Sequence, residues 1–168
     1  DIINICMMRI RVPNQWRGDY LATVGAARIG EQEIVRMGRE LGWDALTRHA
    51  EDWFDLCEQQ MIACIRGIRA GRARATSMHD PLPRTPPEGI PATADVTVDP
   101  EAALITVDMT DNIDSLPVGV NLSHACARTA ALVGVFNSLP TPMQPNAGSL
   151  RRIVVHLREG CVVGIPRH

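Results

Sequence analysis

Four polar side chains lie in short segments where their residue types could support binding or catalysis. Arg11 lies between a strand-like apolar run and a proline turn, where a guanidinium can bind a carboxylate or phosphate through two hydrogen bonds or form a structural ion pair. Asp19 can cap a helix or act as a site carboxylate. Asn121 and Asn146 lie in turns, where asparagine often bonds its own backbone. These four residues are the candidate catalytic residues, each with a structural alternative.

The histidines of the chain do not converge on one site. His79-Asp80 is the only adjacent His/Asp pair, and it can act as an acid–base pair, as a ligand or as a polar part of the loop that follows. His49 and His124 fall in predicted helices, and His156 falls in a predicted strand. Neither a G-x-S-x-G nor an H-E-x-x-H motif occurs. The sequence predicts no metal or cofactor site of its own.

Composition excludes some classes of chemistry. The chain has 17 basic residues, all of them arginine, so neither a phosphate-binding P-loop lysine nor a Schiff-base lysine can lie in it. A net charge of −2 gives no indication of a nucleic-acid or anionic-membrane partner. The five cysteines form no C-x-x-C pair, and no apolar run approaches the length of a membrane span. We therefore expect reduced thiols and a cytoplasmic location.

The apolar pattern of the first half predicts a strand followed by two helices. Residues 2–10 are strand-like, and Asp19 is expected to cap a helix that ends at Gly42. A second helix over 44–68, capped by Asp44, repeats apolar residues at spacings of three and four. Trp53 and Met61 fall on its inward stripe. The two helices are expected to form a helical hairpin packed on a core.

The second half is predicted to contain a β-hairpin, a helix and a strand pair. Residues 80–91 hold five prolines, which predicts a loop. Alternating runs at 94–98 and 104–109 are typical of a β-hairpin. Ser123 can cap a helix over 122–139, and strands are expected at 153–157 and 161–165. The fold class is mixed α/β (α+β).

We expect one continuous region over residues 1–168 rather than separate domains. It comprises a strand and helical hairpin (1–78), the proline-rich loop (79–91), and the β-hairpin, helix and strand pair (92–168). The chain opens without methionine in a strand-like run and closes directly after another. These ends indicate an internal or C-terminal-half piece of something longer.

Four collinear segments resemble the hydantoinase B/5-oxoprolinase family. Residues 11–22 match its R-x-P…G-D-L-x-A segment, and Glu58 matches a glutamate late in the second helix. Residues 119–131 resemble its G-x-I-N…T-R-A-A helix. Residues 145–153 resemble P-x-N-x-G-x-[FL]-R-x-I, and 159–166 fit the strand pair that follows. Each string is short, but their order and spacing together favour the family.

The resemblance implies the B-type subunit of an ATP-dependent cyclic-amide hydrolase that opens a hydantoin, 5-oxoproline or lactam ring. In the family, an A-type partner binds ATP and Mg²⁺ and phosphorylates the substrate oxygen, and the B-type subunit processes the activated intermediate. The implied assembly is a hetero-oligomer, and any divalent metal of the B-type subunit would lie in an N-terminal part that has no counterpart here.

Two departures leave the substrate open. Residues 108–112 read DMTDN where the family usually has D-[FL]-[ST]-G, and the loop before the hairpin is proline-rich rather than acidic. A ketone carboxylase subunit of the acetone or acetophenone type is the alternative activity. A structural or interface role within either enzyme is the non-catalytic alternative.

Overall fold

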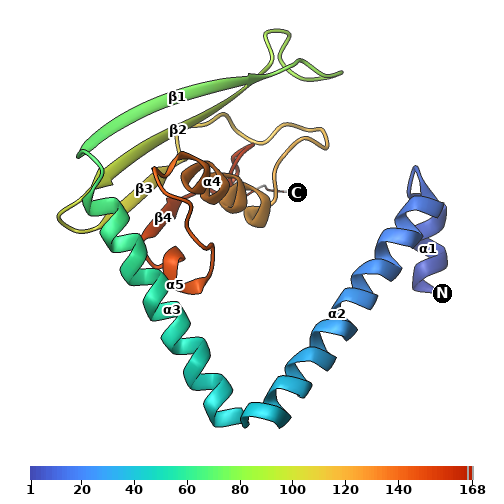
Figure 1. The fold of residues 1–168 in the computed structure, drawn as a ribbon. Helices are drawn as coiled ribbons and strands as arrows, with labels where there is room; N and C mark the ends of the chain where they lie inside the picture. The colour runs from blue at the N-terminus through green and yellow to red at the C-terminus, as the bar shows by residue number, and fades with distance from the viewer. Residues whose placement is uncertain (166, 168) are drawn as a thin grey trace. The chain divides into compact units, whose positions relative to one another are not determined.

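The computed structural model describes residues 1–165 and 167, which divide into two compact units, residues 1–51 and residues 52–168. Helices and a four-stranded mixed sheet make up the chain (Figure 1). This confirms the mixed α/β class. None of the helices in the described part of the chain is long and apolar enough to cross a membrane.

The first unit is helical from its start, so the strand predicted at 2–10 is wrong. Helix α1 spans Ile2–Arg9 and α2 spans Pro13–Leu41. An isolated Ile-rich segment has no neighbouring strand to bond its backbone, whereas a helix satisfies those groups locally, as in the Ile5 N–H bond to the Asp1 carbonyl. Asp19 lies inside α2 and does not cap it, because the helix already begins at Pro13, where a missing N–H costs nothing.

Helix α3 spans Trp43–Arg66 and brings the second unit its first core side chains. Asp44 lies in its first turn, two residues after the N-cap position at Gly42, so the predicted cap at Asp44 is wrong. Cys57, Met61 and Ile65 are buried, whereas Trp53 is 51% exposed. The predicted helix and the inward position of Met61 are confirmed, but the predicted inward position of Trp53 is wrong.

One sheet organises the second unit, with strand order β1-β2-β3-β4. Strands β1 (Gly71–His79), β2 (Ile90–Asp99) and β3 (Leu104–Asp108) are antiparallel neighbours, and β4 (Ile153–His156) runs parallel to β3. The predicted β-hairpin is therefore confirmed as β2–β3. Strand β1 was not predicted, and β2 begins inside the expected proline-rich loop. Pro91 lies near the start of β2, where a missing N–H is tolerated.

Helix α4 (His124–Ser138) lies against one face of the sheet (Figure 1). Ser123 caps it as predicted, its side chain accepting a bond from the Cys126 N–H. The strand predicted at 161–165 is instead a tight, buried turn between two isolated bridges. A Cβ at Gly164 would overlap the Arg158 carbonyl, so this turn has room only for glycine at that position.

Candidate functional site

The sheet has one apolar and one polar face because successive side chains alternate along each strand. Every second residue of β2 and β3 packs toward α4. These residues are Ala94, Val96, Val98, Ile105 and Val107. The residues that alternate with them point away from α4 and are mostly polar. The two faces therefore offer separate candidate sites, an apolar pocket and a charged surface.

On the charged surface, one ionisable residue from each strand lies in a row across the sheet. Arg74 of β1 is the register partner of Asp95 of β2, which is the partner of Asp108 of β3, which in turn is the partner of His156 of β4. We call these four residues the charged row. Because register partners share a face, four side chains from distant parts of the sequence lie side by side.

Ion pairs order the β1–β2 half of the charged row. Arg74 Nη1 lies 3.0 Å from Asp95 Oδ2, and Arg72 Nη2 lies 3.3 Å from Asp95 Oδ1. Arg74 also pairs with Asp111, and this hydrogen bond, with a smaller contribution from Asp95, raises the pKa of Arg74 above its usual value. The Asp95 side chain is only 12% exposed and is satisfied by two guanidinium groups.

Asp108 in the other half of the charged row is held as a carboxylate. Its Oδ1 accepts hydrogen bonds from the Thr110 hydroxyl at 2.6 Å and the Thr110 N–H at 2.8 Å. These bonds lower the pKa of Asp108 below its usual range, and the charges of His156 and Arg72 lower it further against the opposing effect of burial. Asp108 is therefore ionised at neutral pH, and His156 is its register partner on the neighbouring strand.

The loop after β3 is fixed from both sides. Asn112 donates to the carbonyls of Thr93 and Met109 and accepts from the Thr93 N–H at 2.7 Å. Arg158 donates to the carbonyls of Thr110 and Asn112 at 3.0 and 2.6 Å, and its bond to Asp114 raises its pKa. This loop is the segment that departs from the family pattern, and its contacts place Thr110 on Asp108.

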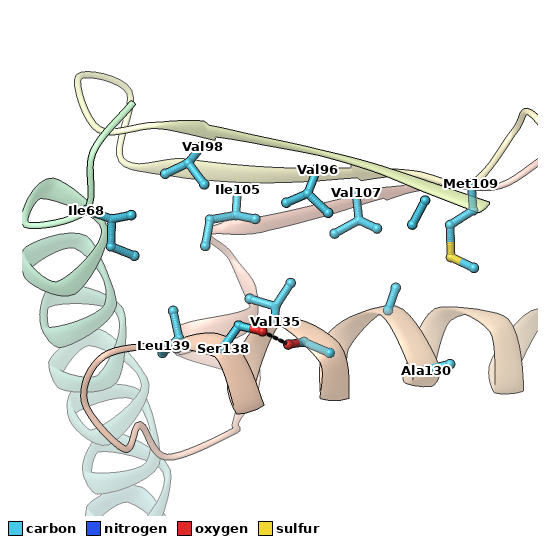
Figure 2. A pocket seen from close by; sticks show the side chains of 13 residues that line it. Ile68, Val96, Val98, Ile105, Val107, Met109, Ala130, Val135, Ser138 and Leu139 are labelled. Atoms are coloured by element: carbon cyan, nitrogen blue, oxygen red, sulfur yellow. Dashed lines mark hydrogen bonds between the residues drawn. The ribbon is translucent and has the colours of Figure 1, made fainter. Parts of the chain in front are cut away.

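The apolar pocket lies between the opposite face of the sheet and α4, with a volume of about 420 Å³. Figure 2 shows Val96, Ile105 and Val107 facing the side of α4 that carries Val135. Its few polar atoms include the Ser138 hydroxyl, which is already bonded to the Gly134 carbonyl at 2.8 Å. The pocket can exclude water from an apolar group, but its lining supplies no ionisable side chain.

The two predicted asparagines bond the backbone, each in its own loop. Asn121 Oδ1 accepts from the Leu116 N–H, and its Nδ2 donates to the Leu116 carbonyl at 2.8 Å. Asn146 caps the short helix α5 (Ala147–Leu150) in a capping box with Ser149. Its Nδ2 also lies 3.0 Å from the buried Cys57 Sγ. Both side chains shape the loops at these positions.

The other predicted residues are exposed. Arg11 lies between α1 and α2, and Asp19 lies on α2, where its backbone carbonyl accepts a bond from the Thr23 hydroxyl. Both belong to the first unit, whereas Asn121 and Asn146 belong to the second. His79 ends β1 with its Nδ1 at 2.7 Å from the Asp80 carbonyl oxygen. Sequence reasoning named none of the charged row as a site candidate.

Glu58 anchors α3 to the segment before β4. Its carboxylate pairs with Arg151 Nη1 at 2.7 Å and with Arg152 Nη2 at 2.5 Å, and the Glu58 side chain is 18% exposed. The bond from Arg151, followed by that from Arg152, lowers the pKa of Glu58 although burial opposes the shift. Glu58 is a structural ion-pair residue of the second unit.

Glu58 should make the free energy of unfolding depend on pH in the acidic range. Since its folded-state pKa is depressed, its contribution is complete above the unfolded-state pKa of about 4.3 and is lost as the pH falls through the folded-state value. We expect the loss of unfolding free energy between pH 7 and pH 3 to be smaller in Glu58→Gln than in wild type, as measured by urea denaturation. Glu101→Gln, in an exposed turn, is the matched control and should keep the wild-type loss. An unchanged loss in Glu58→Gln would contradict the assignment.

The described residues offer little to a metal or a nucleotide. Within residues 1–165 and 167, no group of three or more His, Cys, Asp or Glu side chains could hold a metal ion. Holding the phosphates of ATP requires a glycine-rich backbone cradle or basic groups free to bind them. The sequence contains no lysine, and Arg72 and Arg74 already pair with carboxylates. The charged row therefore does not fit the phosphates of ATP, and no chemical step is assigned to a nucleotide there.

The chain belongs to the hydantoinase B/oxoprolinase family, whose sequence profile matches residues 1–167. The same fold occurs in a solved structure, the ATP-dependent caprolactamase from Pseudomonas jessenii, with a TM-score of 0.76 at 21% sequence identity. That match covers 98% of this chain and 28% of the caprolactamase chain. No curated protein matches this sequence.

Proposed function

We propose that this chain is part of the B-type subunit of an ATP-dependent enzyme that hydrolyses cyclic amides. The observation that carries the proposal is the family match over residues 1–167. The fold shared with an ATP-dependent caprolactamase supports a lactam-type ring as the substrate class. Hydantoins and 5-oxoproline belong to the same class of cyclic amides.

ATP and Mg²⁺ are proposed to bind to a separate A-type subunit. The absence of lysine from the sequence supports this division, because phosphate-binding loops of nucleotide sites commonly use one. Phosphorylation of the amide oxygen by the partner would make that oxygen a good leaving group. The B-type subunit would then hydrolyse the activated ring. The two subunits would form a hetero-oligomer located in the cytoplasm.

The four residues proposed from sequence keep distinct roles in this scheme. Arg11 is proposed to hold the activated substrate, since its guanidinium is exposed and can bind phosphate or carboxylate oxygens. Asp19 is proposed as a nearby site carboxylate on the following helix. Asn121 and Asn146 are proposed to act by holding loop geometry, which their backbone hydrogen bonds support.

The proposal predicts activity only when both subunits are present. The whole protein that carries this chain should release no phosphate from ATP alone, and should do so with its A-type partner and a cyclic amide. The measurement is a coupled phosphate-release assay over 5-oxoproline, hydantoins, lactams, acetone and acetophenone, with and without bicarbonate. Ring opening by the lone subunit without ATP would contradict the two-subunit scheme. Turnover confined to a ketone with bicarbonate would move the assignment to a ketone carboxylase.

The same assay tests the role of Arg11. Losing a charged hydrogen bond to the substrate should lower kcat/KM roughly 10- to 100-fold in Arg11→Ala. Arg17→Ala, which removes an exposed arginine from α2, is the matched control and should keep wild-type turnover. Equal activities of the two variants would remove Arg11 from the site.

A further inference from the structure

The charged row contains one carboxylate that ion pairs satisfy and one that they do not. Asp95 is bonded by Arg74 and approached by Arg72, so both of its oxygens lie beside guanidinium groups. Asp108 uses Oδ1 for both of its bonds to Thr110, and among the described residues its Oδ2 accepts no hydrogen bond. This remaining acceptor belongs to the residue that is the register partner of His156.

Strand register places His156 next to Asp108 in the sheet. Strands β3 and β4 are parallel and in register, which makes Asp108 and His156 the last paired residues of the two strands. Their side chains share the polar face at the edge of the sheet, because β4 is an outer strand. His156 is exposed, so a substrate can reach it, whereas Asp108 is only partly exposed.

We propose that His156 and Asp108 form a catalytic acid–base pair, in which His156 exchanges protons with the substrate and Asp108 orients the imidazole. The inference rests on the proposed function and names the group that would act in its hydrolytic step. An ionised carboxylate beside an imidazole stabilises its protonated form and fixes its orientation. The Thr110 hydroxyl and N–H keep Asp108 in the charged state that this role requires.

The proposed step balances with water as the only added reactant. As the oxygen of water bonds to the activated amide carbon, the imidazole takes one proton from that water. As the bond between this carbon and the ring nitrogen breaks, the imidazolium returns the proton to the nitrogen. The second water proton also passes to the nitrogen as the new carbonyl forms. The ring opens to an acyl phosphate whose other end carries the free amine. A second water then bonds to the acyl carbon as its bond to the phosphate oxygen breaks, which releases phosphate and leaves a carboxylate.

The charges facing the pair allow its protonation to be tested separately from turnover. The facing groups are Arg72 and Arg74 of β1, Asp95 of β2 and Asp111 of the loop after β3. Asp108→Asn keeps an oxygen that can accept the two Thr110 bonds and removes only the negative charge. The imidazole titration of His156, followed by NMR in the whole protein, should therefore have its midpoint at lower pH in Asp108→Asn than in wild type.

Turnover by the two-subunit complex tests the catalytic role. His156→Gln should lower kcat by about 10²- to 10⁴-fold with little change in KM, the usual range for loss of a general acid–base group. Asp108→Asn should lower kcat less and move the acid limb of the kcat profile to lower pH. His124→Gln, at the exposed start of α4, is the matched control and should retain wild-type turnover.

Each negative result would contradict a different part of the proposal. Equal His156 titration midpoints in wild type and Asp108→Asn would overturn the pair. A wild-type kcat in His156→Gln would overturn its catalytic role while leaving the proposed function intact. Failure of the wild-type complex to open any cyclic amide would overturn the proposed function and the catalytic role together, whatever the NMR titration showed.

Discussion

Met61→Ala is expected to lower the free energy of unfolding by about 2–5 kcal/mol, the range for truncating a fully buried methionine. The Met61 side chain is 0% exposed and belongs to the core cluster of the second unit, together with Ile65, Ile105 and Ile153. Truncation removes its contacts and leaves a cavity that the sheet and helices cannot easily close. Urea denaturation of the two proteins under identical conditions measures the difference.

Trp53→Ala is the comparison on the same helix. Because half of the Trp53 side chain is exposed, its truncation should cost about 1 kcal/mol or less. A tryptophan buried on the inward stripe of the helix would instead cost about 3–5 kcal/mol. Similar losses in the two variants would show that the buried face of α3 has been assigned wrongly.

Gly148→Ala is expected to cost at least about 3 kcal/mol, because the new methyl group would meet backbone rather than a movable side chain. A Cβ at this position would overlap the carbonyl of Phe54, where α5 passes against α3. Neither helix can retreat without disturbing the Glu58 ion pairs or the Asn146 capping box. The midpoint of urea denaturation should fall accordingly.

Gly134→Ala provides the matched control within the same unit. Gly134 lies in α4, and a methyl group added there would meet nothing within 4 Å beyond the adjoining backbone of its own helix. Alanine is the better helix former by about 1 kcal/mol, so this variant should match or exceed wild-type stability. A loss equal to that of Gly148→Ala would indicate a general intolerance of added volume rather than the close approach to Phe54.

Elements with a strong helical period and the strands of the β-hairpin and β4 were predictable from the sequence, whereas the structures of two other apolar runs were not. The repeat around Met61 identified α3, and Ser123 marked the start of α4. The runs at 2–10 and 161–165 contain residues that favour strands, but neither has a neighbouring strand to complete a ladder. Backbone hydrogen bonding therefore decided these segments against local preference.

Strand β1 escaped prediction because its side chains carry no apolar signal. It alternates small residues such as Ala73 and Ala75 with Arg72 and Arg74, and every residue of the strand is exposed. Its pairing with β2 is maintained by backbone hydrogen bonds and by the ion pairs to Asp95. A strand of this kind is recognisable only when its partner is known.

Predicting the charged row requires the register of the strands, which the sequence shows only indirectly. Residues 105–108 and 153–156 read ITVD and IVVH, two runs of equal length that each end in an ionisable residue. A helix between two strands favours their parallel pairing. Combining these two signals would have placed His156 beside Asp108. Treating each strand separately left His156 as an isolated residue.

The sheet also combines pairings of very different sequence separation. Strands β1, β2 and β3 are joined by short loops, whereas β3 and β4 meet only after residues 109–152, which include α4 and α5, have been placed. The entropy of closing a loop must be overcome before the contacts it brings together can form. The three-stranded meander can thus assemble early, and β4 joins as a late event of folding. The juxtaposition of Asp108 and His156 would then arise only at the end of the folding reaction, so partly folded chains would lack it.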